Sequence, residues 1–336
     1  MPLFLKLVGD VAAHDPDLAK LALVGLRKLQ SMTPPAPMPA RSTLAQLGNA
    51  TLRDYGGGGR PAVFVPSLIN TPAVLDISAE RSLLGWLAGQ GVRPLLVDWG
   101  AVTADMAGLG IGDYVSDILV PMLSELGEPV DLVGYCLGGT MAMAAAQLMP
   151  VRSLTLIAAP WRFGGYPAKD RAAMAELWNA MQPMARAMGL LPMEALQTLF
   201  WTLDPQGTVN KYVCLAELDP QSDEAALFLA MEAWANGGEP LPFAAARELF
   251  EDLIASDLPG TGTWSVGGEQ IDPLKLACPV MEIVSTIDRI TPHATSAGIG
   301  KRLELDRGHV GMITGGQAKQ HLWEPLRDWL SQSHKD

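Results

Sequence analysis

The stretch DLVGYCLGGTMAMAAAQL, residues 131–148, decides how the rest of the sequence is interpreted. It begins with a short apolar run that is typical of a buried strand, and it continues into an alanine- and methionine-rich run that favours a helix. Between the two lies a tight turn with glycine at positions 134, 138 and 139. Cys136 stands at the centre of this turn, so the sequence places a thiol between a strand and a helix.

Apolar strands and helices alternate on both sides of this turn. The expected strands are 61–68, 93–100, 129–135, 151–160, 278–285 and 301–306, and the expected helices are 81–91, 111–127, 139–149 and 321–333. Short apolar strands that alternate with helices predict an α/β protein whose mostly parallel central sheet is covered on both faces.

The alternation stops after Pro160 and resumes at Cys278, and the block between them has a helical pattern. A parallel sheet that is interrupted by helices before its last two strands is the plan of an α/β-hydrolase fold with a lid. The expected divisions are an N-terminal helix with a proline-rich linker at 1–50, the α/β-hydrolase core at 51–160 and 278–336, and a helical lid insertion at 161–277.

The turn at Cys136 has the layout of a nucleophile elbow, with cysteine where hydrolases usually have serine. Residues two before and two after the nucleophile must be very small, because strand and helix crowd together there, and Gly134 and Gly138 meet this demand. The turn also aims backbone N–H groups and the positive end of a helix at the sulfur, which favours a thiolate. The alternative is a buried structural cysteine in a glycine-rich turn.

An oxyanion hole beside such a nucleophile needs two N–H donors. The first is expected from Leu137, directly after the cysteine. The second is expected from the loop VPSLINTP, residues 65–72, with Ile69 preferred over Leu68. The same loop also fits a simple turn in which Asn70 caps the next helix, and both interpretations can hold together.

The partners of the nucleophile are expected after the last two strands, in the chain order acid then histidine. Asp288 follows strand 278–285, and His309 follows strand 301–306. Asp306 is too close to His309 in sequence to orient it easily, so Asp288 is preferred. The other histidines are expected to be solvated or packed, and they are His14, His293, His321 and His334.

Composition narrows the class of protein. The formal net charge of the 336-residue chain is −12, which offers no basic surface for nucleic acid. Three cysteines make no disulfide framework and suit a reducing cytoplasm. The N-terminal sequence is not typical of a secretory signal, no apolar run is long enough for a membrane span, and His and Cys never cluster at metal-ligand spacing. We therefore expect a cytoplasmic protein without a metal site.

Several motifs together resemble polyhydroxyalkanoate (PHA) synthases, most of all the short-chain class that works with a second subunit. They are VFVPSLINTPAVLDIS, SLLGWLAGQGVRPLLVDWG, LVGYCLGGTMAMAAA, LTLIAAPW, IDRITP and GHVGMITG, within residues 62–330. The resemblance implies that Cys136 is the acylated nucleophile, His309 the general base and Asp288 its partner. One departure lies in the insertion, where the family's tryptophan-asparagine-x-aspartate stretch appears only as EAWANGGEPLP.

The resemblance also implies what the protein acts on and meets. The substrate would be 3-hydroxyacyl-CoA, polymerised through a cysteine acyl-enzyme with release of CoA and without a cofactor. The implied partners are the growing polyester chain, a second synthase subunit or a second copy of the chain, and the surface of polyester granules in the cytoplasm. The alternative function is a cysteine-nucleophile hydrolase of the same fold, either an intracellular PHA depolymerase or an acyl thioesterase.

Overall fold

The computed structural model describes residues 2–33, 38–39 and 41–332, and an eight-stranded sheet lies at its centre. The strand order is β1-β2-β4-β3-β5-β6-β11-β12. β2 is antiparallel to β1 and β4, and all other neighbours are parallel, which confirms the expected α/β sheet. The strands are β1 (Ser42–Leu47), β2 (Ala50–Asp54), β3 (Pro61–Val65), β4 (Arg93–Asp98), β5 (Asp131–Tyr135), β6 (Ser153–Ile157), β11 (Val280–Ser285) and β12 (Lys301–Leu305).

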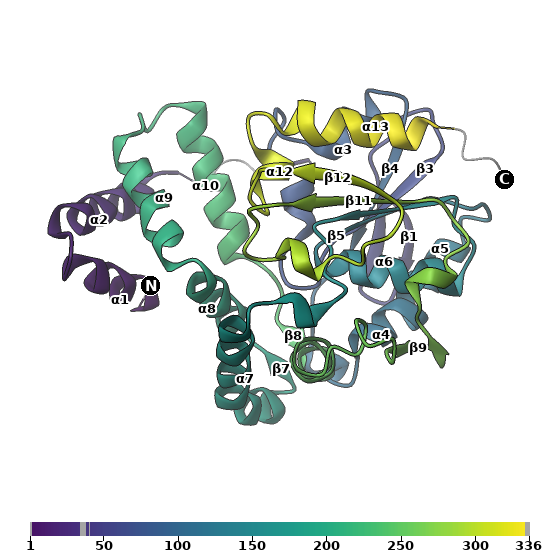
Figure 1. Ribbon diagram of the computed structural model, residues 1–336. Helices are drawn as coiled ribbons and strands as arrows, with labels where there is room; N and C mark the ends of the chain where they lie inside the picture. The colour runs from purple at the N-terminus through teal and green to yellow at the C-terminus, as the bar shows by residue number, and fades with distance from the viewer. Residues whose placement is uncertain (1, 34–37, 40, 333–336) are drawn as a thin grey trace.

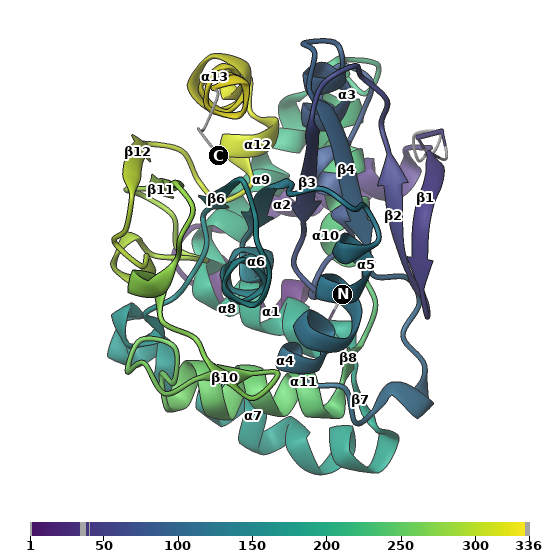
Figure 2. The same cartoon turned by 90° about the vertical axis from the view of Figure 1, so that its right-hand side faces the viewer.

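Helices cover both faces of this sheet (Figure 2). One face packs against α3 (Leu83–Ala88) and against the C-terminal helix made of η8 (Lys319–Trp323) and α13 (Glu324–Ser331). The other face packs against α6 (Leu137–Leu148) and against a helix made of α4 (Ile111–Asp113), η3 (Tyr114–Leu119) and α5 (Val120–Ser124). Every residue of β3 and β5 is buried, which explains the apolar runs at 61–65 and 132–135.

The chain between β6 and β11 is mostly helical, where the insertion was expected (Figure 1). Its helices are α7 (Ala168–Met188), α8 (Met193–Leu203), α9 (Pro205–Glu217), α10 (Asp223–Asn236), α11 (Phe243–Arg247) and η5 (Glu248–Ala255). The last part of the insertion returns to the sheet domain, because Glu248 accepts the Gly112 N–H and the Asp272 N–H donates to Gln147. Within the described ranges, no helix has the length and apolar character needed to cross a membrane.

Short elements connect these helices and strands. They are η1 (Pro72–Leu75), η2 (Ala104–Met106), η4 (Phe163–Gly165), η6 (Pro273–Lys275), η7 (His293–Thr295), α12 (Gly311–Thr314), β7 (Leu190–Leu191), β8 (Leu241–Pro242), β9 (Ser265–Val266) and β10 (Glu269–Gln270).

The N-terminal region holds two helices rather than the single helix expected from the sequence. They are α1 (Pro2–Ala12) and α2 (Pro16–Ser31), and α2 starts where the Asp15 side chain caps it and Pro16 takes its first position. This pair packs on α9 of the insertion, well away from the sheet (Figure 1). Lys28 Nζ donates to the carbonyls of Leu215 (3.0 Å) and Ala216 (2.8 Å) at the end of α9.

The expected boundary between linker and core at residue 50 is also wrong. β1 and β2 form an antiparallel hairpin that joins the sheet through β4, so the sheet domain already includes residues 42–50. Leu47 pairs with Ala50, which leaves Gly48 and Asn49 as the turn, and Gly48 has a positive φ of 57°. A glycine-containing two-residue turn is a known hairpin signal, and it stands in the sequence beside the more conspicuous proline-rich segment.

Candidate active site

The turn between β5 and α6 has no room for a side chain two residues before or two residues after Cys136. A Cβ on Gly134 would lie 2.4 Å from Gly139 Cα, and a Cβ on Gly138 would lie 2.1 Å from the carbonyl oxygen of Val65. Cys136 itself has φ 56° and ψ −132°, a conformation that non-glycine residues rarely adopt. Such strain persists only where the surroundings impose it, and here it holds the thiol at the first turn of α6.

Asp288 and His309 come together from the loops after β11 and β12. His309 Nδ1 lies 2.6 Å from Asp288 Oδ2, and both side chains are almost fully buried. Cys136 lines the same cavity as His309, and its charge acts on the imidazole. The structure therefore brings together the three side chains proposed from the sequence, in the order thiol, imidazole, carboxylate.

Four donors surround the Asp288 carboxylate. Its Oδ1 accepts the backbone N–H groups of Ile290 (2.7 Å) and Thr291 (3.1 Å), while its Oδ2 accepts His309 Nδ1–H and the Thr291 hydroxyl (2.8 Å). Thr291 Oγ1 also lies 3.2 Å from His309 Nδ1. Sequence reasoning missed this threonine, although it stands three residues after Asp288, where Ser and Thr hydroxyls often bond a nearby carboxylate.

The pKa values of the acid and the base are shifted in opposite directions. For His309, burial lowers the pKa, but the charges of Asp288 and Cys136 and their hydrogen bonds outweigh it and raise the pKa to about 10. For Asp288, burial raises the pKa, but the His309 charge and the hydrogen bonds from His309 and Thr291 bring it below its ordinary value. At neutral pH the site therefore holds an imidazolium beside a carboxylate, with its positive charge next to the thiol.

Tyr135, the residue before Cys136, fixes the other side of the imidazole. Its ring stacks on His309 with 5.0 Å between the ring centroids, and its hydroxyl donates to the His309 carbonyl oxygen at 3.2 Å. Burial, followed by the charges of Cys136 and Asp288, raises the pKa of Tyr135 well above its ordinary value, so the phenol stays protonated. The sequence offered no signal for this role beyond the position next to the cysteine.

The proposed oxyanion donors lie at two places around the thiol. Leu137 is the first residue of α6, so its N–H has no partner within the helix. Ile69 lines the cavities around Cys136, and its N–H donates to Ser67 Oγ at 3.1 Å within its own loop, so this N–H would have to leave Ser67 to bind an oxyanion. The Leu68 side chain lines a different cavity together with Trp99, on the β4 side of the loop. These positions favour Ile69 over Leu68 as a donor, and the oxyanion role of all three residues stays a prediction.

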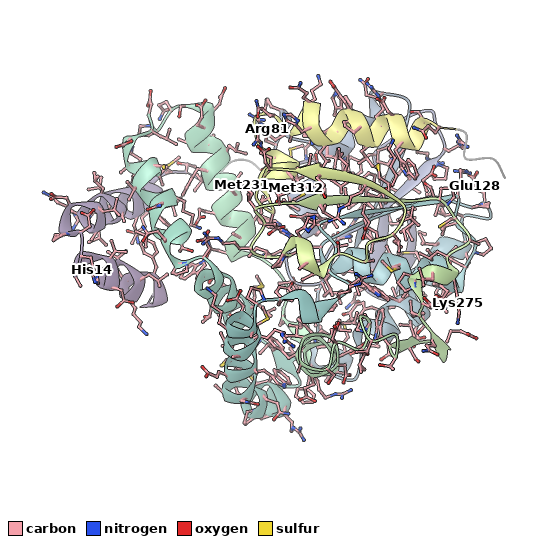
Figure 3. The ribbon with its side chains drawn as sticks, in the orientation of Figure 1. His14, Arg81, Glu128, Met231, Lys275 and Met312 are labelled. Atoms are coloured by element: carbon pink, nitrogen blue, oxygen red, sulfur yellow. The ribbon has the colours of Figure 1, made fainter. Side chains whose placement is uncertain are left out.

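A cavity of about 360 Å³ opens from Cys136 and His309 toward the insertion. Its far wall includes Trp201 of α8, Lys211 of α9 and Trp234 of α10. Trp234 Nε1 donates to the Thr71 carbonyl at 2.8 Å, so the tryptophan of the EAWANGGEPLP segment ties α10 to the loop 65–72. Met231 of α10 lies where the insertion meets the sheet domain (Figure 3), and its sulfur accepts the hydroxyl of Thr314 in α12 at 3.8 Å. The insertion therefore forms part of the site.

The competing sequence candidates lie elsewhere. His14 is in the N-terminal helix pair, far from the sheet (Figure 3), and His293 contacts Glu304 on the surface. Asp306 is exposed and pairs with Arg307. His321 lies in η8, and His334 lies outside the described residues. In the part of the chain that the structure describes, no three His, Cys, Asp or Glu side chains gather closely enough to hold a metal ion.

Comparison with known proteins finds sequence relatives and solved structures of similar fold. The chain is 29% identical over 293 residues to the Poly(3-hydroxyalkanoate) polymerase subunit PhaC of Haloferax mediterranei, covering 81% of this chain and 58% of that protein. It is 27% identical over 289 residues to the subunit of the same name from Allochromatium vinosum, covering 81% of each. The chain thus spans less than two thirds of the Haloferax relative.

Solved structures support the fold alone. A monoacylglycerol lipase from Paleococcus ferrophilus superposes with a TM-score of 0.51 at 16% identity, over 85% of this chain and 99% of that one. An epoxide hydrolase from Bacillus megaterium superposes with a TM-score of 0.53 at 14% identity, over 84% and 98%. The model of the Alpha/beta hydrolase family matches residues 56–318, which include the strand-turn-helix at Cys136 and the loops that carry Asp288 and His309. The chain belongs to the alpha/beta hydrolase family.

Proposed function

We propose that the protein is a PHA synthase-like acyltransferase that polymerises 3-hydroxyacyl-CoA through an acyl-enzyme on Cys136. The observation that carries this proposal is a cysteine on the elbow that shares a cavity with an imidazole hydrogen-bonded to Asp288, in a chain similar over four fifths of its length to curated PHA polymerases. The proposed cycle takes the CoA thioester as substrate and needs no resident cofactor.

Acylation begins from an ion pair in which the Cys136 proton is already held by His309, so that a thiolate lies beside an imidazolium. The thiolate sulfur attacks the thioester carbonyl, and the oxyanion is held by the N–H groups of Leu137 and Ile69. The bond from the carbonyl carbon to the CoA sulfur then breaks, and His309 returns a proton to the leaving thiolate. Asp288 stabilises the imidazolium, in keeping with the raised pKa of His309.

Transfer reverses these roles with a different acceptor. His309 takes the proton from the 3-hydroxyl of another acyl unit, whose oxygen attacks the Cys136 thioester. The bond from carbonyl carbon to Cys136 sulfur breaks, an ester forms, and the free cysteine is restored. Sulfur suits this task because exchange of one thioester for another is close to isoenergetic, so the acyl group stays activated until the alcohol arrives.

The alternative acceptor is water, and it would make the same site a depolymerase or thioesterase. The similarity to PHA polymerases favours the synthase, and the insertion places Trp201 and Trp234 in the wall of the cavity that contains the thiol. The proposal extends to a cytoplasmic location at polyester granules and to a second synthase subunit or a second copy of this chain as partner.

One assay separates these functions. Purified protein is mixed with 3-hydroxybutyryl-CoA, and free CoA and the size of the product are both measured over time. We expect CoA release with growth of a polyester, whereas CoA release with only free acid would establish the hydrolase. Cys136→Ala should abolish CoA release, and Cys214→Ala, which removes an exposed cysteine on α9, should not.

A further inference from the structure

Two separate spaces meet at Cys136. The larger is the cavity of about 360 Å³ described above, which also contains His309. The smaller has a volume of about 50 Å³ and lies on the side of Leu137, beneath the insertion. His309 lines the larger space and does not line the smaller one. Any group that must exchange a proton with His309 therefore has to occupy the larger space.

The wall of the smaller space is apolar. It is formed mainly by Phe163, Tyr166, Met174, Leu196, Leu249 and Ile254. The Tyr166 hydroxyl is engaged with the Ile290 carbonyl at 2.9 Å, and Thr291 bonds Asp288, so the polar side chains at this wall already have partners. Such a surface accepts hydrocarbon and gives no compensation to a buried hydroxyl or charge.

The chemistry of the proposed cycle assigns the parts of the substrate to these spaces. The leaving CoA sulfur and the incoming hydroxyl both exchange protons with His309, and the polyester continues through the oxygen on C3, so all three belong in the larger space. The alkyl substituent on C3 is the one apolar branch that ends within the acyl unit. It is therefore the part that a small apolar pocket can hold.

We propose that the smaller space is the pocket for this alkyl substituent, and that Met174, Leu196 and Leu249 limit the substituent to one or two carbons. This inference rests on the proposed acyl-enzyme at Cys136. A cavity needs roughly 10–15 Å³ to hold one water-sized group, so about 50 Å³ accommodates about three to five such groups. C2, C3 and a methyl or ethyl substituent fill that room, and a pentyl substituent exceeds it.

The test measures acylation of Cys136 directly, by intact-protein mass spectrometry after brief mixing with 3-hydroxybutyryl-CoA or 3-hydroxyoctanoyl-CoA. The wild type should be acylated faster by the four-carbon thioester. Leu249→Ala enlarges the pocket and should raise the octanoyl-to-butyryl rate ratio by about tenfold or more, since a few methylenes in an apolar pocket discriminate by that much. Met174→Ala should act in the same direction if Leu249→Ala fails to fold.

The matched control is Leu253→Ala, on the same helix η5. Leu253 is fully buried but lines neither space, so its truncation leaves a core defect without enlarging the pocket. The rate ratio should stay at the wild-type value in this variant. Equal wild-type rates for both thioesters, or an unchanged ratio in both pocket variants, would overturn the pocket assignment. No acylation by either thioester would instead overturn the proposed function.

Discussion

Removal of one hydroxyl group tests whether Asp288 acts through a fully bonded carboxylate. In Thr291→Val the side chain keeps nearly the same shape, but the 2.8 Å hydrogen bond from Thr291 Oγ1 to Asp288 Oδ2 is lost. The three other donors to Asp288 remain, since two are backbone N–H groups and the third is His309. The substitution therefore removes one hydrogen bond from the Asp288 carboxylate and leaves the other three in place.

The size of the effect follows from the charge on the acceptor. A hydrogen bond to a charged group contributes about 1.5–3 kcal/mol. Loss of all of this energy from the transition state corresponds to a rate loss of roughly ten- to 150-fold. Because the remaining donors still hold Asp288 in place, we expect a loss near tenfold. The pKa of Asp288 should rise and the pKa of His309 should fall, because the carboxylate is less stabilised as an anion.

The assay is the rate of CoA release in a single turnover with 3-hydroxybutyryl-CoA, measured across pH. Thr291→Ser restores a hydroxyl at the same position and should recover most of the rate, which a purely steric role of Thr291 would not predict. A Thr291→Val enzyme within twofold of the wild type, with an unchanged free energy of unfolding, would refute this reasoning. A Thr291→Ser enzyme as slow as Thr291→Val would refute it as well.

Three further outcomes are expected. In an NMR titration His309 should remain protonated to about pH 10, and Asp288→Asn should lower that pKa; a wild-type transition near pH 6.5 would contradict this. The pKa of His309 is higher in the folded protein than in the unfolded chain. The stability contributed by this proton is therefore present below pH 6.5 and is lost as the pH rises toward 10. Gly138→Ala should lower the free energy of unfolding by about 1–3 kcal/mol or more in urea denaturation, since the new Cβ meets the Val65 carbonyl, whereas Gly108→Ala, with open space around it, should change little. Gly25→Ala should make residues 2–31 susceptible to limited proteolysis while the sheet domain stays folded, because the new Cβ would lie 1.8 Å from the Tyr212 backbone oxygen. Equal resistance of this variant and the wild type to the protease would contradict the packing of α2 on α9.

The sheet domain could be predicted from the sequence because its signals are local. The buried strands are mostly apolar runs, and the turn at Cys136 carries its glycines at the positions where a side chain would collide. The placement of Asp288 and His309 followed from topology, because both loops lie at the carboxyl ends of neighbouring parallel strands. Chain order alone was therefore enough to propose the pair that lies 2.6 Å apart.

What the sequence did not predict depends on contacts between distant segments. The β1–β2 hairpin has only a short turn signal at Gly48, and its place in the sheet is set by pairing with β4. Thr291 and Tyr135 become informative only after the loops are folded, since each acts by its distance from His309. The contact of α2 with α9 joins residues nearly 190 positions apart, and no local pattern encodes such a contact.

That last contact bears on how the chain is made. The apolar face of α1 and α2 is completed by α9, and Lys28 meets the Leu215 carbonyl 187 positions later. At a translation speed of about 5–20 residues per second, the ribosome needs about 10–40 s to synthesise that intervening length. During this time α1 and α2 lack the surface of α9 that covers their apolar residues in the folded protein, so these residues stay exposed until α9 has been made.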